Sequence, residues 1–183
     1  MKKIIVAILL LLFAMPSFAA HPLRSGVYVN TKAGLMRTGM KRDGEKKDDV
    51  VFPFALALGL RLRHFRIEAE YTFATTAKRD NYEQQTDTIF GQIYYDVPFK
   101  SAIRPFFNVG MGRHNTEIKE KDVFKANRHG WAWNVGGGVT WNISNAVNLD
   151  LGYRYLDIGK MKTETGTIKT SHHIVYIGWR YVF

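Results

Sequence analysis

Large apolar residues alternate with small, polar or charged residues along most of the chain beyond residue 26. The clearest run is 52–62, in which every second residue is phenylalanine or leucine and the residues between them are proline, alanine, glycine or arginine. A period of two places neighbouring side chains on opposite faces of a β-strand. The alternation predicts eight strands, at 27–35, 52–62, 66–73, 89–97, 107–112, 131–143, 147–155 and 175–183.

Eight such strands can close into a barrel whose outward face is apolar. Single-chain outer-membrane barrels have an even number of antiparallel strands, and each strand needs about 9–11 residues to cross the membrane. Tryptophan and tyrosine near the strand ends are typical of a girdle at the lipid headgroups. A soluble barrel would have the opposite polarity, with apolar residues inside. The pattern therefore predicts an all-β protein, an eight-stranded antiparallel up-and-down transmembrane β-barrel.

The segments between the predicted strands alternate in length. The long polar segments are 38–49, 74–87, 113–129 and 158–170. The short links are 63–65, 98–103 and 144–146. In outer-membrane barrels the long loops are extracellular and the short turns are periplasmic. We therefore expect four long extracellular loops and periplasmic N- and C-termini.

The first nineteen residues have the features of a cleaved signal peptide. Lys2 and Lys3 form a positive region, an apolar run follows at 4–14, and Ser17 and Ala19 supply the small residues of a cleavage site. This run is too short for a helix that spans a bilayer, which needs about 20 residues. We expect cleavage between Ala19 and Ala20, which leaves residues 20–183 as one barrel domain in a bacterial outer membrane.

The charge and the cysteine count narrow the class of partner. The formal net charge is +10, or +8 without Lys2 and Lys3, and the chain has no cysteine. A basic exported protein meets anionic lipid headgroups and surface glycans rather than nucleic acid. We therefore expect outer-membrane lipids and lipopolysaccharide as partners, together with a host or environmental surface ligand. No disulfide, metal or cofactor is expected.

The residues between the apolar ones predict a filled barrel interior. An eight-stranded barrel is only wide enough to be packed with its own side chains. The predicted inward set has charges of both signs: Lys32, Arg61, Arg66, Glu68, Glu70, Asp96, Asp150, Arg154 and Arg180. Because an unpaired buried charge is costly, we expect these groups to pair across the lumen, with Asp150 near Arg154 and Arg180. A small-solute channel would instead need an open lumen.

Several strands carry motifs of known small barrels. The last eight residues, Tyr-Ile-Gly-Trp-Arg-Tyr-Val-Phe, resemble the C-terminal β-signal that the outer-membrane assembly machinery reads. Segments 66–71, 104–112 and 149–155 resemble strands of the opacity-protein-like and OmpA-transmembrane-like barrels. The resemblance implies an assembly signal at Trp179, Tyr181 and Phe183. It also implies a Gram-negative surface protein, a class that includes adhesins, serum-resistance factors and surface antigens, and the fold alone does not choose among them.

One group of residues has the composition of a hydrolase site. If the last two strands pair symmetrically across their loop, Asp157 lies opposite Ser171 and Tyr155 lies opposite His173. An acid, an imidazole and a hydroxyl are the groups of nucleophilic catalysis. Lipid A deacylases are similar small barrels with a lipid-facing Ser/His/acid site, although their His-x-Ser order is reversed here. Ser171, His173 and Asp157 are therefore an alternative catalytic set, for a lipid A-directed hydrolase.

Basic residues gather in the long polar segments. In the third segment, Lys119, Lys121, Lys125 and Arg128 are candidates for binding anionic groups of lipopolysaccharide or host glycans. The fourth segment is also basic, whereas the first mixes both signs. Our interpretation is a non-enzymatic surface protein with a structural or adhesive function carried by four extracellular loops. A lipid A hydrolase is the first alternative, and a small-solute channel is the second.

Overall fold

The computed structural model describes residues 25–42, 45–74, 77–79, 82–99, 101–120, 124–163 and 166–183. Its strands are β1 (Gly26–Arg42), β2 (Glu45–Val51), β3 (Pro53–Leu62), β4 (Phe65–Ala74), β5 (Ala77–Arg79), β6 (Tyr82–Asp96), β7 (Ile103–Glu120), β8 (Phe124–Asn142), β9 (Val147–Thr163) and β10 (Gly166–Val182). Both β2 and β3 pair with β1, and both β4 and β5 pair with β6. The ten segments therefore make eight barrel strands.

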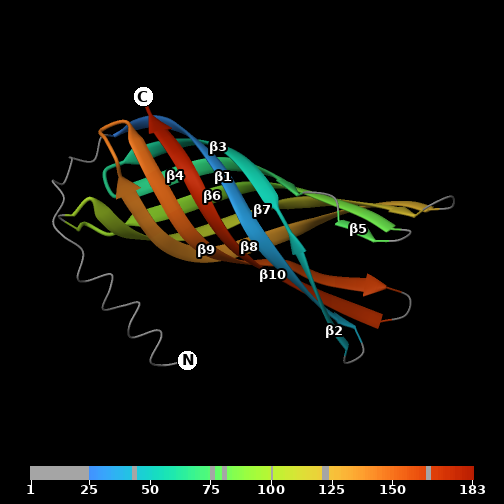
Figure 1. The fold of residues 1–183 in the computed structure, drawn as a ribbon. Coiled ribbons are helices and arrows are strands. Elements are labelled where there is room, and N and C mark those ends of the chain that lie inside the picture. The colour runs from blue at the N-terminus through green and yellow to red at the C-terminus, as the bar shows by residue number, and fades with distance from the viewer. Residues whose placement is uncertain are drawn as a thin grey trace, which may run out of the picture.

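The eight strands close into one antiparallel barrel (Figure 1). Neighbours in sequence are neighbours in the sheet, and β1 pairs with β10 from Tyr28↔Val182 to Lys41↔Lys169. This pairing leaves no open edge along most of β1 and β10, as a closed barrel requires. The predicted fold class is confirmed. In the described ranges, no helix has the length and apolar character needed to cross a membrane.

The two ends of the barrel differ in their connections. At one end, the short-turn end, β3 and β4 are joined by Arg63 and His64, and β8 and β9 are joined by residues 143–146. At the other end, the hairpin end, the strands project well past the barrel as paired ribbons (Figure 1). The predicted signal peptide and its cleavage site lie outside the described residues.

The prediction of four long loops at the hairpin end is wrong, because most of these residues continue the strands. β1 runs to Arg42 before β2 begins at Glu45, and β7 and β8 remain paired as far as Glu120↔Phe124. Beyond the apolar band the outward residues become polar, so the period of two disappears from the sequence. The ladder continues because its hydrogen bonds need only backbone groups.

The alternation of inward and outward residues is confirmed. On β3 the side chains alternate strictly between buried and exposed, beginning with buried Pro53. Two inward glycines make room for tyrosines on the neighbouring strand: Tyr28 pairs with Gly59, and Tyr176 pairs with Gly152. A Cβ atom at Gly59 would lie 2.3 Å from Cζ of Tyr28. Glycine therefore relieves crowding in this narrow barrel.

Candidate functional site

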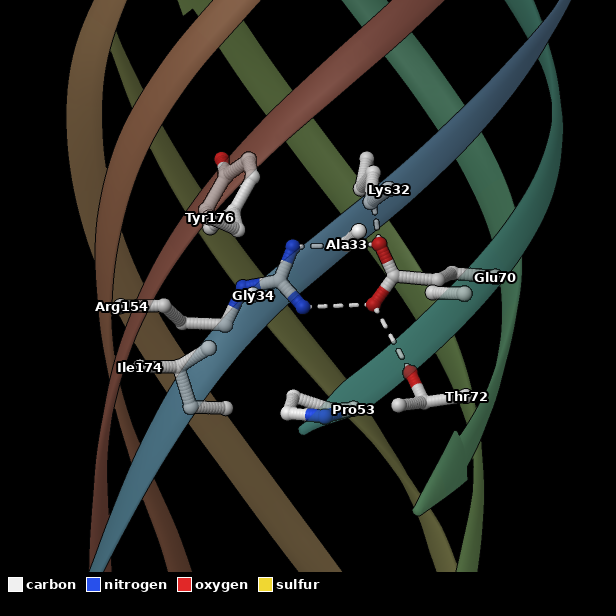
Figure 2. Close-up of a pocket in the computed structure, with 10 residues that line it drawn as sticks. Lys32, Ala33, Gly34, Pro53, Glu70, Thr72, Arg154, Ile174 and Tyr176 are labelled. Atoms are coloured by element: carbon white, nitrogen blue, oxygen red, sulfur yellow. Dashed lines mark hydrogen bonds and ion pairs between the residues drawn. The ribbon is translucent and has the colours of Figure 1, made fainter. Parts of the chain in front are cut away.

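The lumen holds two clusters of charges, and the one nearer the hairpin end is called the upper cluster here. Figure 2 shows Lys32, Glu70 and Arg154 of this cluster. The Lys32 ammonium on β1 donates hydrogen bonds to Glu68 and Glu70 on β4 and, at 2.9 Å, to the hydroxyl of Tyr94. Arg154 on β9 forms a bidentate pair with Glu70, and its Nη2 donates to the Tyr94 hydroxyl at 3.1 Å. Two cations and two carboxylates thus neutralise each other in a buried site.

A lower cluster lies nearer the short-turn end. Asp96 pairs with Arg61 at 2.8 Å and with Arg66 at 2.8 Å. Asp150 pairs with Arg66 at 3.1 Å and with Arg180 at 3.2 Å. Arg66 therefore bridges the two carboxylates. The two clusters connect six strands, β1, β3, β4, β6, β9 and β10, and all of their charged side chains are buried.

All nine charges that the sequence predicts to point inward are buried. The structure brings Asp150 and Arg180 together, in the expected ladder register of Asp150 opposite Gly178. Arg154 differs from the expectation, because it pairs with Glu70 across the lumen instead of with Asp150 on its own strand. A contact across the lumen depends on barrel closure, which the strand period does not encode.

Aromatic and amide side chains complete the lumen, and sequence reasoning gave them no role. The Arg66 guanidinium lies over the Tyr94 ring, 4.4 Å from its centroid, and Arg154 lies over Tyr176 at 5.2 Å. The Asn108 amide on β7 donates to Gln92 on β6 at 3.3 Å and to Asn134 on β8 at 3.2 Å. Their inward parity was readable from the sequence, but their partners were not.

A small cavity lies on the hairpin-end side of the upper cluster, toward Pro53, Thr72 and Ile174, which Figure 2 draws below Glu70 and Arg154. Its volume is about 30 Å³, which is room for about two waters. Glu70 and Arg154 line one side of it, with Pro53, Thr72 and Ile174 around the rest. Beside this cavity, ion pairs of Glu70 with Lys32 and Arg154 join β1, β4 and β9 across the lumen.

The alternative catalytic residues lie on neighbouring strands, and their hydrogen bonds go to other groups. As expected, Asp157 pairs with Ser171 in the ladder and Tyr155 pairs with His173. His173 Nδ1 shares a 2.6 Å hydrogen bond with the Tyr153 hydroxyl, and Asp157 Oδ1 accepts one from the Gly159 N–H at 2.7 Å. Within the described part of the chain, no hydrogen bond joins Ser171, His173 and Asp157 to one another. Among the residues that the structure describes, no group of three or more histidine, cysteine, aspartate or glutamate side chains is placed to hold a metal ion.

The remaining predicted residues lie at the two ends of the barrel. Trp179, Tyr181 and Phe183 are exposed on the outward face at the short-turn end. At the hairpin end, Lys119 on β7 stands opposite Lys125 on β8, and Arg128 stands opposite Thr116. The fourth loop candidate, Lys121, lies outside the described residues.

Known proteins share this architecture. The description "Outer membrane protein beta-barrel domain" names a family that matches residues 5–183. Neisserial surface protein A (NspA) has a TM-score of 0.73 and 21% identity, over 87% of this chain and 98% of NspA. Ail of Yersinia pestis, solved in complex with the heparin analogue sucrose octasulfate, has a TM-score of 0.53 and 13% identity, over 85% of this chain and 99% of Ail. PagN of Salmonella typhimurium is 21% identical over 92 residues, which are 45% of this chain and 38% of PagN.

These likenesses agree with the geometry of the barrel. At such low identity the solved structures show the fold, and the family match extends over nearly the whole chain. The outward face is apolar, the strands are antiparallel and even in number, and the sheet is closed, as in a barrel that spans an outer membrane. The chain belongs to the outer membrane protein beta-barrel domain family.

Proposed function

We propose that this protein is a non-enzymatic surface protein in which a closed barrel holds four β-hairpins outside the cell, and that these hairpins carry a structural or adhesive function. The length of the ladders supports this proposal. β7 and β8 stay paired for nine residues beyond Met111, the last outward apolar residue of β7. At about 3.3 Å per residue, this hairpin continues for roughly 30 Å of strand beyond Met111.

The closed lumen supports a scaffold rather than a channel. Buried ion pairs from six strands cross the interior, and the cavity beside them has room for about two waters. We expect the purified protein to give no ion conductance in planar bilayers. Steady single-channel currents from the unmodified protein would favour the channel and contradict the proposal.

The hydrogen bonds at the rim support a non-enzymatic role. A general base must be within hydrogen-bond reach of its nucleophile. Here one ring nitrogen of His173 is engaged by Tyr153, and Asp157 binds a backbone N–H. We therefore expect lipid A from cells with the protein and from cells without it to have the same mass spectrum. Loss of an acyl chain that depends on Ser171 would instead establish the hydrolase.

The orientation has a direct test. Long connections outside and short turns in the periplasm are the rule for this class of barrel. Protease added to intact cells should cut within 41–47 or 119–125 and leave the barrel strands whole. Cutting at residues 63–64 or 143–146, with the hairpins untouched, would invert the topology.

Binding is tested with whole cells that carry or lack the protein. Ail, which has the same fold, was solved with a heparin analogue, so a sulfated polyanion is a suitable first probe, followed by host matrix and complement regulators. The matched control is a barrel in which residues 40–47 and 161–168 are each replaced by a two-residue turn. We expect the shortened barrel to reach the membrane and to lose binding. Equal binding by both strains would remove the adhesive function.

A further inference from the structure

We infer that the short-turn end of the lumen binds one small monovalent inorganic anion, of the size of chloride, between the guanidinium groups of Arg61 and Arg180. The side chains that carry this inference are all buried. The inference goes beyond the proposed function and does not depend on which end of the barrel faces outside the cell.

The charged side chains of the lower cluster form a chain of alternating sign with a cation at each end. In order, the chain runs through Arg61, Asp96, Arg66, Asp150 and Arg180. Each carboxylate contacts two arginines of the chain. Among the described residues, each terminal arginine contacts one carboxylate only. The lower cluster therefore has three positive charges and two negative charges.

The surrounding lumen does not supply the missing negative charge. The upper cluster is balanced, with two cations and two carboxylates. The residues opposite Arg180 in the ladder are Asn30 and Asn148, which are neutral. Arg104, a further buried cation near this end, donates its Nε to two backbone carbonyl groups. Because an uncompensated buried charge is costly, the excess positive charge favours a bound anion.

Both terminal arginines have buried N–H groups without a hydrogen-bond partner among the described residues. These groups are Nε of Arg61 and both Nε and Nη1 of Arg180. Buried polar groups are nearly always hydrogen-bonded, and a guanidinium offers donors only. A water molecule would accept these hydrogen bonds but leave the excess charge in place. An anion would accept them and also neutralise the charge.

The two ends of the chain come close together beside Tyr28. The Arg180 guanidinium lies over the Tyr28 ring, 5.4 Å from its centroid. The same ring covers Gly59 on β3, where a Cβ atom would lie 2.3 Å from Tyr28 Cζ. Arg61 is the next inward residue of β3, about 7 Å farther along the strand. The charges of Arg61 and Arg180 repel each other. One anion between them would replace this repulsion with two attractive contacts and close the chain into a ring.

The charges around the site select a small monovalent anion. The lower cluster lacks one negative charge, which chloride or bromide supplies. Sulfate and phosphate carry more charge than the cluster lacks. Their larger oxyanion groups would also approach the carboxylates of Asp96 and Asp150, which pair with the same arginines.

The test measures the stability of the full barrel in detergent by urea unfolding, with sodium gluconate replaced by sodium chloride at constant ionic strength. A ligand that binds only the folded state stabilises that state by mass action. For a dissociation constant of about 10 mM, replacing about 100 mM gluconate with chloride should raise the folding equilibrium constant roughly tenfold. Bromide should have the same effect as chloride, and sulfate should have none.

Two variants remove the need for the anion in different ways. Arg180→Met removes the excess cation, and Asn148→Asp places a carboxylate opposite Arg180 in the ladder. Each should abolish the dependence of stability on chloride. The matched control is Asn134→Asp, which adds the same charge to the lumen between Gly110 and Leu156. The control should keep the tenfold dependence, because its carboxylate is not next to the terminal arginines.

The outcomes that contradict the inference are specific. They are an unmodified barrel whose stability is the same in chloride and in gluconate, and a chloride dependence that all three variants keep or that all three lose. Heat-modified gel mobility shows that each variant is folded, and Asn148→Asp decides alone if Arg180→Met does not fold. A crystal soaked in bromide should show one ordered ion between Arg61 and Arg180. Bromide on the outer surface only, as an adventitious ion only, would overturn the inference, while the proposed surface function is tested separately on cells.

Discussion

In the lumen each of the four buried carboxylates touches at least one cation, whereas on the hairpins lysine stands opposite lysine across four strands. The two regions use the same residue types and the same strand period. They differ in the surrounding medium. A buried charge away from water must find a partner in the protein, while an exposed charge is screened by water and salt.

This difference separates two roles of charge in one small barrel. Lumen charges pair across strands, so we expect them to stabilise the folded barrel. We expect the charged residues of the hairpins to contribute little to stability. Mutations in the lumen should therefore lower the free energy of unfolding, whereas mutations of the hairpin charges should leave it nearly unchanged.

The largest expected effect is at Glu70, which accepts hydrogen bonds from Lys32 and Arg154. Glu70→Gln leaves two buried cations with less compensation, so we expect the free energy of unfolding to fall by about 3–5 kcal/mol. Urea unfolding in detergent or lipid, followed by tryptophan fluorescence, measures the change. A loss below about 1 kcal/mol would show that the lumen charges tolerate removal of a partner as surface charges do.

A second test asks whether the loss of stability in lumen variants comes from broken ion pairs or from altered packing. Asp150→Asn should lower the free energy of unfolding by about 3 kcal/mol, because Arg66 and Arg180 both lose a buried partner. Adding Arg180→Met should recover part of the loss, and only part, since Arg66 remains. A double-mutant cycle in urea provides the coupling energy. Strictly additive losses would mean that Asp150 and Arg180 do not interact.

The hairpin side of the comparison predicts a much smaller change. Lys160→Gln with Lys169→Gln should alter the free energy of unfolding by less than about 0.5 kcal/mol in the absence of lipopolysaccharide, with a small gain from relief of like-charge repulsion. The same urea titration measures it. A destabilisation as large as that of Glu70→Gln would show that Lys160 and Lys169 have a structural role.

The smallest expected effect is that of ionic strength, which should change the stability of the hairpin variants, relative to the unmodified barrel, but not that of the lumen variants. Raising the ionic strength from about 0.1 M to about 1 M shortens the Debye length from about 10 Å to about 3 Å. The small gain in the free energy of unfolding from Lys160→Gln with Lys169→Gln should disappear at high salt. The loss in the free energy of unfolding from Asp150→Asn should persist. Equal salt sensitivity of both changes would indicate that water reaches the lumen charges.

The sequence by itself determined the barrel and the face of each strand residue, because a period of two assigns faces before any pairing is known. It did not show that the polar segments are strands, since β1 beyond Leu35 has no apolar alternation and is held by backbone hydrogen bonds. Nor did it show that Lys41 pairs with Lys169, because the two residues are far apart in sequence.

Only the tertiary structure decided which charges meet. Closure of β1 against β10 brings Lys41 opposite Lys169, and a register shift between β9 and β10 sets Lys160 opposite Lys169. In the lumen, closure brings Arg154 to Glu70, 84 residues away in sequence. A strand pattern fixes the face of a residue, but contacts across a barrel depend on strand register and closure. These are set by the pairing of whole strands.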